Sequence, residues 1–346
     1  MCGVVGILSS EAPVDPEALR RATASLHHRG PDGQRQWIDT TGRVGLGHAR
    51  LSIIDLEGGA QPLANEDESI HAVVNGELYD FERQRADLEA RGHRFRTRSD
   101  SEVLVHLYEE YGVRCVDHLR GEVAFVLWDA DNRVLLAGRD RFGIKPLYYA
   151  DNGKRLVLAS EAKALFAAGV PAAWDAESVF QAASVGGPAQ DRTFFAGVRQ
   201  LPAGHVLIAT AGHRNVVRYW DLDFPLAGAV HDERSDAEHA DALRDALDEA
   251  IRLRLRADVP VAFYLSGGLD SCSLLGLYSR LGRGPARAFT IAFDNPAYDE
   301  LAIAKEMAAH VGAELTAVPV SDDAIADDFG RAVLHAETLF NNTNGV

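Results

Sequence analysis

The chain has 346 residues, of which 47% are hydrophobic and 25% are charged, the balance of a soluble globular protein with room for two domains. Its formal net charge of −16 argues against a partner such as nucleic acid or an anionic membrane surface. No apolar run reaches the roughly 20 residues of a membrane helix, and no basic segment precedes the apolar start as in a signal peptide.

The first two hundred residues contain many short strands and glycine-rich turns. Strands are expected where apolar or β-branched runs end at Gly, Asp or Asn, namely 4–8, 44–54, 69–76, 122–129, 134–140, 146–150 and 155–160. Two predicted helices interrupt them, one over 81–91 and one that begins at Ser101. Runs of strands with few helices predict a layered α+β domain over residues 1–210.

The pattern changes after residue 210. Residues 211–236 mix Gly, Pro and charged residues, and we interpret them as a linker. Beyond them, helices are predicted at 237–256, 272–281, 301–312 and 324–340, and strands at 259–265, 287–294 and 314–320. This alternation predicts an α/β domain with a parallel sheet over residues 237–346.

Cys2 directly follows the initiator Met1. If processing removes Met1, one residue carries both a thiol and an α-amine that titrates near ~7.7–8.0 and can accept the thiol proton. The pattern therefore indicates an N-terminal nucleophile, and a small residue that happens to stand second is the alternative. Cys115 and Cys272 are expected to be packing residues. Three dispersed cysteines form no disulfide framework, which favours a reducing cytoplasm.

Nine short segments follow one another through the first domain. They are MCGVVGI, HHRGPDG, GLGHARLSIIDL, GGAQPL, VVNGELYD, SDSEVL, AFVLWD, GRDRFGIKPLYY and SEAKAL. In this order they resemble the glutamine-hydrolysing asparagine synthetase family, which begins with a class II glutamine amidotransferase domain. The resemblance implies an α+β N-terminal-nucleophile hydrolase fold, an αββα sandwich, in a homodimer. It also implies that Cys2 releases ammonia from L-glutamine.

Arg50 ends a predicted strand, and its guanidinium can bind a carboxylate through two hydrogen bonds. The resemblance implies that Arg50 binds the α-carboxylate of glutamine, whereas a surface arginine is the alternative. It also places Leu51, Ile53 and Ile54 in the glutamine pocket. Asp100 precedes a helix and could serve as its N-cap. The resemblance makes it a ligand of the glutamine α-ammonium.

Asn75 and Gly76 end the predicted strand 69–76. An Asn amide and a Gly N–H can both point at a developing oxyanion. A plain Asn-Gly hairpin turn is the alternative. Given the resemblance, we interpret the pair as an oxyanion hole, with Glu77 beside it in the glutamine pocket. The same resemblance places the turn at residues 29–33 at the border of this site.

A second motif, LSGGLDS at residues 265–271, lies between an apolar strand and a helix. Paired glycines let the backbone approach a phosphate, and a helix N-terminus presents N–H groups to it. The motif is not a Walker A loop. It resembles the pyrophosphate loop of ligases that adenylate a carboxylate, and a plain Gly-rich turn is the alternative. The implied ATP-binding residues are Leu265, Ser266, Gly267, Gly268, Asp270, Ser271 and Ile291.

Asp270 is acidic within an anion site, so we expect it to hold Mg²⁺. Family members carry a second acidic segment, SGxGxDE, after the third strand–helix unit, and no such segment occurs up to Val346. We therefore expect an incomplete α/β parallel-sheet pyrophosphate-loop domain that does not complete synthesis.

The predicted function is a glutamine-dependent amidotransferase that uses ATP to activate and amidate a carboxylate, L-aspartate by default. The alternatives are amidation of a natural-product carboxylate, a glutaminase joined to another acceptor domain, and a truncated subunit that does not synthesise.

Overall fold

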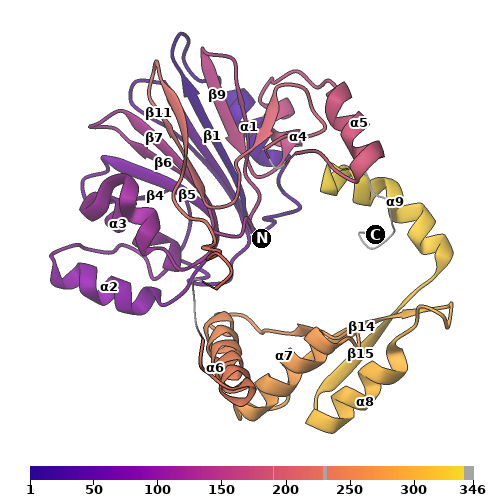
Figure 1. Cartoon of the computed structure of the whole chain (residues 1–346). Coiled ribbons are helices and arrows are strands. Elements are labelled where there is room, and N and C mark those ends of the chain that lie inside the picture. Colours follow the sequence, from indigo (N-terminus) through magenta and orange to yellow (C-terminus); the bar gives the residue numbers. More distant parts are fainter. Residues whose placement is uncertain (190, 229–231, 339–346) are drawn as a thin grey trace. The chain divides into compact units, whose positions relative to one another are not determined.

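The computed structural model describes residues 1–189, 191–228 and 232–338. The chain divides into two compact units, with Met1–Asp223 forming the body of the first and Phe224–Ala336 the body of the second. Figure 1 shows the elements of both units. Among the described helices, none has both the length and the apolar character needed to cross a membrane.

Two six-stranded antiparallel sheets form the centre of the first unit. The first sheet has the order β10-β8-β9-β1-β3-β2, with β1 Gly3–Ser9, β2 Gly33–Ile38, β3 Val44–Arg50, β8 Tyr148–Asp151, β9 Arg155–Ala159 and β10 Val198–Gln200. The second has the order β12-β11-β7-β6-β5-β4, with β4 Leu63–Ala64, β5 Ile70–Leu78, β6 Gly121–Asp129, β7 Val134–Arg139, β11 His205–Ala209 and β12 Arg214–Arg218.

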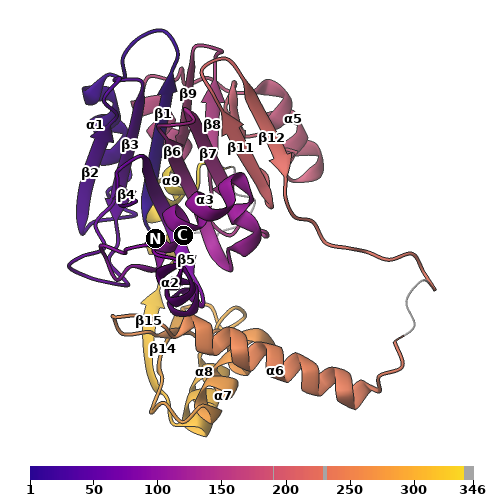
Figure 2. The ribbon, with the colours of Figure 1, turned by 90° about the vertical axis from the view of Figure 1, so that its left-hand side faces the viewer.

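Helices cover the outer faces of both sheets (Figures 1 and 2). The first sheet carries α1 Pro16–Ala24 and α4 Ala162–Ala167. The second carries α2 Phe81–Ala90 and α3 Val103–Tyr111, together with the 3-10 turns η1 Asp100–Glu102 and η2 Gly112–His118. Another helix, α5 Ala176–Val185, precedes β10. These layers confirm the predicted αββα sandwich.

The burial pattern of β1 explains the layering. All seven of its residues are buried, so both faces of this strand lie inside the protein. Val5 and Ile7 join the core under α1 and α4. Val4 and Leu8 point the other way, into the core between the two sheets. Because successive strand residues face opposite sides, one short apolar strand contributes to two cores.

Gly6 lies where the two sheets approach each other. A Cβ atom at this position would stand 2.7 Å from Cγ1 of Val126 on β6, closer than real Cβ atoms approach other atoms. The lack of a side chain at Gly6 therefore sets the distance between the sheets.

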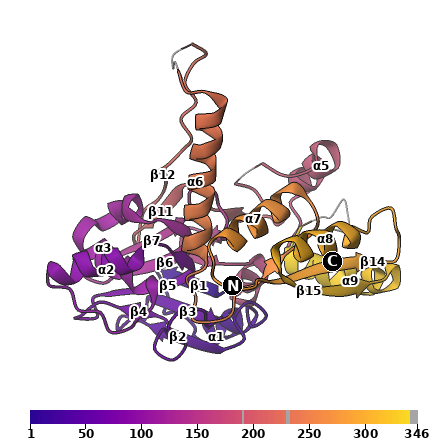
Figure 3. The ribbon, with the colours of Figure 1, turned by 90° about the horizontal axis from the view of Figure 1, so that it is seen from below.

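The second unit is a parallel three-stranded sheet with helices, as the alternating pattern predicts. Its strands β13 Phe263–Tyr264, β14 Arg287–Phe293 and β15 Glu314–Val320 lie in the order β13-β14-β15. Its helices are α6 Asp236–Arg254, α7 Leu269–Arg280, α8 Leu301–Val311 and α9 Asp322–Ala336. Figure 3 shows α7 and α8 next to this sheet. The small core between them contains Leu265, Leu275, Ala286, Ala288, Ala304 and Ala308.

Several boundaries differ from those predicted. Strand β3 ends at Arg50 instead of residue 54, because the chain turns back and Asp55 adopts a left-handed φ of 53°. The predicted strand 259–265 is reduced to Phe263–Tyr264. Helix α9 ends at Ala336, and the predicted end of this helix at residue 340 lies outside the described residues.

Residues 214–218 form β12, which pairs with β11 in a hairpin. This part of the predicted linker 211–236 therefore belongs to the second sheet. Short elements such as α1, β2, α4 and α5 were not predicted either. Their signals are weak, although α1 has a recognisable start in the N-cap Asp15 followed by Pro16.

Replacing Gly6 by Ala should lower the free energy of unfolding by about 1–3 kcal/mol, because the new methyl group must displace Val126 or separate the sheets. Gly33 on β2 has open space at its Cβ position, so Gly33→Ala serves as the matched control in the same sheet. Urea denaturation of both variants measures the difference. Equal midpoints would show that Gly6 does not limit the sheet spacing.

Candidate active site

Cys2 lies just before β1 and lines a cavity of about 130 Å³ in the first unit. The Leu51 N–H points at Cys2 Sγ from 3.4 Å, and Sγ lies 3.6 Å from Leu51 O. From the other side, Arg29 Nε donates to the Cys2 carbonyl at 2.9 Å and its Nη1 pairs with Glu161 at 2.8 Å. Cys2 is thus held through its thiol by Leu51 and through its backbone carbonyl by Arg29.

The protonation of this end of the chain is set mainly by burial. Burial raises the pKa of the Cys2 thiol, and the Leu51 N–H opposes that shift. Burial also lowers the pKa of the α-amine that begins the chain, at Met1. Both shifts favour the neutral forms, a thiol that can give up a proton and an amine that can accept one.

Asn75 is fully buried on β5 and lines the same cavity. Among the described residues, neither its Oδ1 nor its Nδ2 has a hydrogen-bond partner. Leaving a buried polar group unsatisfied costs about 1–3 kcal/mol. A bound molecule with a carbonyl group could accept a hydrogen bond from Nδ2, and one with an N–H group could donate to Oδ1.

Gly76 follows with a φ of 153°, and a Cβ atom there would lie 2.0 Å from the carbonyl oxygen of Glu122. Only glycine fits this position. Strand β5 continues through Asn75 and Gly76 to Leu78, and the pair lies opposite Ala124 and Val123 of β6. The hairpin alternative is therefore wrong.

Arg50, the last residue of β3, borders the cavity together with Leu51, Ile53 and Ile54. Its guanidinium donates to the carbonyl oxygens of Leu56 at 3.0 Å, Ile54 at 3.3 Å and Asp55 at 2.6 Å. These bonds use three of the five N–H groups of an arginine and hold its plane at the cavity wall. The side chain is not a free surface arginine.

Acidic side chains form another part of the cavity lining, where Glu77 and Asp100 both lie. Burial, with help from Asp100, raises the pKa of Glu77 to about 8, and nearby Lys145 opposes the shift. Burial also raises the pKa of Asp100, whose Oδ2 accepts the Leu78 N–H at 2.7 Å. Two carboxyl groups that resist ionisation provide a site for a cationic group.

The N-cap alternative for Asp100 does not hold, because Ser99 is the residue that caps the turn and accepts the Ser101 N–H.

The structure brings all nine residues predicted for the glutamine pocket to one cavity. They are Cys2, Arg50, Leu51, Ile53, Ile54, Asn75, Gly76, Glu77 and Asp100. Sequence reasoning missed Lys145, which lines the cavity and pairs with Glu122 at 3.2 Å. It also gave no role to Arg29, although the segment RGPDG was recognised.

The glycine-rich loop of the second unit connects β13 to α7. Gly267 has a φ of 84°, and Gly268 is the N-cap of α7 without a capping side chain. The Oγ atoms of Ser266 and Ser271 lie 3.1 Å apart, and Ser271 Oγ donates to Gly268 O at 3.2 Å. Two hydroxyl groups therefore lie together at the start of a helix.

The remaining residues predicted for this site lie around the loop. Leu265 is buried and donates its N–H to Phe289 O at 2.8 Å. Asp270 lies in the first turn of α7 and is exposed. Ile291 is half-exposed on the neighbouring strand β14. The fold thus brings the residues of the predicted ATP site to one end of the parallel sheet.

The high pKa of Glu77 predicts how stability depends on pH. An acid with an ordinary value of 4.5 that titrates near 8 when folded binds more protons in the native state, so its effect on stability becomes less favourable from pH 4.5 to 8. Replacing Glu77 by Gln removes this effect. In thermal unfolding at pH 5, 6.5 and 8, the Tm of Glu77→Gln should increase relative to the Tm of the unmodified protein as the pH rises. A constant difference in Tm would contradict the shift.

Two family models match the chain. Residues 1–220 match the glutamine amidotransferase domain, and residues 242–346 match asparagine synthase. Amidase chyE of Penicillium rubens is 42% identical over 95% of this chain and 50% of its own length. Amidase chry2 of Gibberella zeae is 39% identical over 98% of this chain and 52% of its own length. Glutamine-hydrolysing asparagine synthetase 1 of Bacillus subtilis is 33% identical over 97% of this chain and 52% of its own length.

The chain therefore spans about half the length of these relatives. The amidotransferase model alone covers well over half of the chain, and the order of the two domains is the one that the sequence motifs predict. The chain belongs to the glutamine-hydrolysing asparagine synthetase family, with a glutamine amidotransferase domain at its start.

Proposed function

We propose that the first unit hydrolyses L-glutamine to glutamate and ammonia, with Cys2 as the nucleophile. One observation carries this proposal: a single cavity holds a thiol, an unpartnered buried amide, a guanidinium and two carboxyl groups. Glutamine offers a complementary group to each of them. Arg50 binds its α-carboxylate, Glu77 and Asp100 bind its α-ammonium, and the side-chain amide reaches Cys2 and Asn75.

In the proposed reaction, the Cys2 sulfur attacks the side-chain carbonyl carbon of glutamine. Loss of Met1 leaves the α-amine on Cys2 itself, and this amine accepts the thiol proton. The oxyanion that forms is stabilised by Asn75 Nδ2 and the Gly76 N–H. The ammonium group then returns the proton to the departing nitrogen, which leaves as ammonia. Water hydrolyses the remaining thioester, which yields glutamate and restores the thiol.

The second unit, we propose further, contributes to an ATP site at which a carboxylate is activated for reaction with this ammonia. Ser266, Gly267, Gly268 and Ser271 suit the phosphates, because N–H and hydroxyl groups converge at the start of α7. Leu265 and Ile291 would lie beside the nucleotide. Asp270 would supply one carboxylate to Mg²⁺, whose chemistry is to neutralise phosphate charge.

L-Aspartate is the default acceptor, since relatives of this architecture are named asparagine synthetases. The two amidases with higher identity favour a second candidate, a different carboxylate amidated by the same chemistry. We further propose a homodimer located in the cytoplasm.

Replacing Cys2 by Ala should abolish glutamate release while leaving the N-terminus equally open to Met1 removal. Cys272→Ala is the matched control, because Cys272 packs against the core of the second unit and should leave the rate unchanged. Intact-mass measurement should find the active protein without Met1. Activity in Cys2→Ala, or in protein that retains Met1, would refute the mechanism.

Arg50 and Asn75 should affect different kinetic constants. Arg50→Ala removes a ligand of the substrate carboxylate. The loss should cost about 2–5 kcal/mol of binding free energy and should therefore raise KM for glutamine. Asn75→Ala removes an oxyanion donor and should lower kcat by about 10²–10³-fold with little change in KM. Steady-state glutamate release measures both constants. A change in KM alone for Asn75→Ala would exclude its role as an oxyanion donor.

A further inference from the structure

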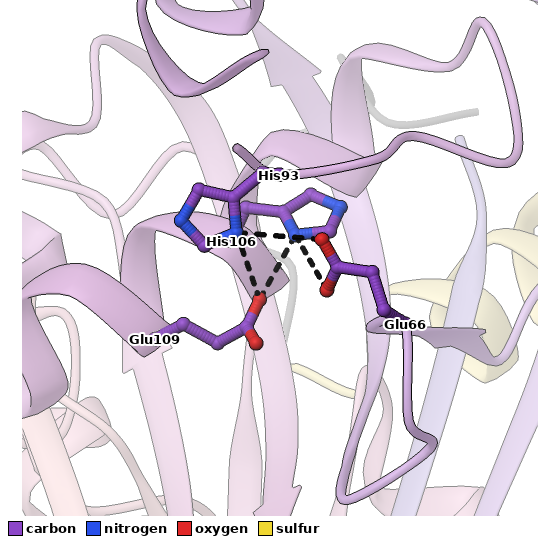
Figure 4. Close-up of side chains that lie close together, drawn as sticks. All are labelled: Glu66, His93, His106 and Glu109. Atoms are coloured by element: carbon purple, nitrogen blue, oxygen red, sulfur yellow. Dashed lines mark hydrogen bonds and ion pairs between the residues drawn. The ribbon is translucent and has the colours of Figure 1, made fainter. Parts of the chain in front are cut away.

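A second cluster of ionisable side chains lies on the helix-covered side of the second sheet. Glu66 follows β4, His93 follows α2, and His106 and Glu109 lie on α3. Figure 4 shows the four side chains pointing toward one another. One ligand-type atom from each lies within 4.8 Å of the other three. None of the four lines the Cys2 cavity, so the cluster is separate from the proposed glutaminase site.

The nitrogen–oxygen distances within the cluster are near those between ligands of a tetrahedral metal ion. His93 Nδ1 lies 3.5 Å from Glu66 Oε1 and 3.4 Å from Glu109 Oε2. His106 Nδ1 lies 3.6 Å from Glu66 Oε2 and 2.9 Å from Glu109 Oε2. Four ligands at about 2.0–2.1 Å from a tetrahedral Zn²⁺ are separated from each other by about 3.3 Å. Since the four ligand atoms already lie within 4.8 Å of one another, side-chain adjustments suffice to coordinate an ion.

Hydrogen bonds to residues outside the cluster orient three of the four side chains. His93 Nε2 lies 3.1 Å from Glu110 Oε1, whereas His106 Nε2 lies 3.7 Å from Glu102 Oε1, beyond hydrogen-bond distance. Glu109 Oε1 accepts from Asn65 Nδ2 at 2.9 Å, and Glu66 Oε1 accepts the Arg94 N–H at 2.7 Å. Metal-bound histidines typically direct their second ring nitrogen at a carboxylate, as His93 does.

The cluster gathers negative charge in a partly buried place. Glu66 and Glu109 lie beside two imidazoles whose ring centroids are 5.1 Å apart, and buried Glu102 lies 3.7 Å from His106 Nε2. A divalent ion between the four side chains would compensate the charge of these carboxylates.

We propose that Glu66, His93, His106 and Glu109 bind one Zn²⁺ ion. Imidazole nitrogens and carboxylate oxygens are ordinary zinc ligands. Four protein ligands leave no position for a substrate, so the site is structural. The His93, Glu66 and Glu109 side chains are 12%, 24% and 24% exposed, which leaves an entry path for the ion.

The ion would join three segments that are distant in sequence and would hold the one that leads into the active site. His93 and His106 flank residues 94–105. Within that stretch, Glu102 accepts the backbone N–H groups of Arg96 and Thr97, and Asp100 lines the Cys2 cavity. Fixing both ends of this segment restricts the position of Asp100.

The test uses the full 346-residue chain, stripped with chelator and titrated with ZnCl₂ at pH 7.5. Calorimetry should show one Zn²⁺ bound per chain, and the Tm should rise with added zinc. The same measurements in the Cys2→Ala background should give the same result, which excludes binding by the thiol. A wild-type chain that binds no stoichiometric zinc, or whose Tm does not respond to it, would overturn the proposal and leave only an ion-pair cluster.

Variants assign the ligands. His93→Ala and Glu109→Gln should abolish the calorimetric signal, whereas His213→Ala, which removes an exposed histidine outside the cluster, should retain it. Glu110→Gln keeps all four ligands and should weaken binding by about 10–100-fold, because it changes the carboxylate that orients His93, together with the exposed ion pair of Glu110 with Arg91. This variant remains informative if a ligand variant does not fold. Unchanged affinity in His93→Ala and Glu109→Gln would place the zinc elsewhere.

Discussion

The register between β1 and β3 is the constraint on which the candidate active site depends. Gly3 pairs with Ala49, so Cys2 comes beside the end of β3, where Arg50 and Leu51 stand. The Leu51 N–H can then reach Cys2 Sγ. A shift of one residue would send every side chain of β1 to the opposite face. Because both faces of β1 are buried in separate cores, such a shift would disrupt both, and the core packing holds the thiol in place.

The second sheet supplies the other half of the cavity through β5. Asn75 stands opposite Ala124 in this strand and is fully buried, yet its amide lacks a partner among the described residues. The pairing of β5 with β6 keeps that amide in place in the absence of substrate. The amide loses its water and becomes oriented when the protein folds. It is therefore already in position to donate to a carbonyl oxygen that enters the cavity. The raised pKa of Glu77 has the same origin, because the fold buries this carboxyl group at the cavity before a ligand is bound.

Helix α3 links this cavity to the proposed zinc site. The turn η1 precedes it and carries Asp100 at the cavity, whereas His106 and Glu109 lie further along the helix. The two sites therefore lie on consecutive elements, η1 and α3, and no side chain belongs to both. In the second unit, the loop at residues 265–271 stands at the end of a parallel strand, the usual position of ligands in open α/β sheets. The two units thus use unrelated backbone geometries, an antiparallel strand end and a strand-to-helix turn, to present their polar groups.

The sequence by itself determined the longer strands of the sandwich, the parallel sheet of the second unit and the residues predicted for a glutamine pocket, which the structure brings to one cavity. Apolar runs and ordered motifs carry that information locally. It did not determine the small elements α4, α5 and β12, whose sequence signals are too short. It also did not predict that β5 continues past Gly76, because an Asn-Gly pair is typical of a turn. Only the tertiary structure brought Lys145 to the cavity, Arg29 to the carbonyl of Cys2, and Glu66 and His93 to His106 and Glu109. The reason is physical: such contacts depend on strand register and helix packing between segments distant in sequence, which no local pattern of residues encodes.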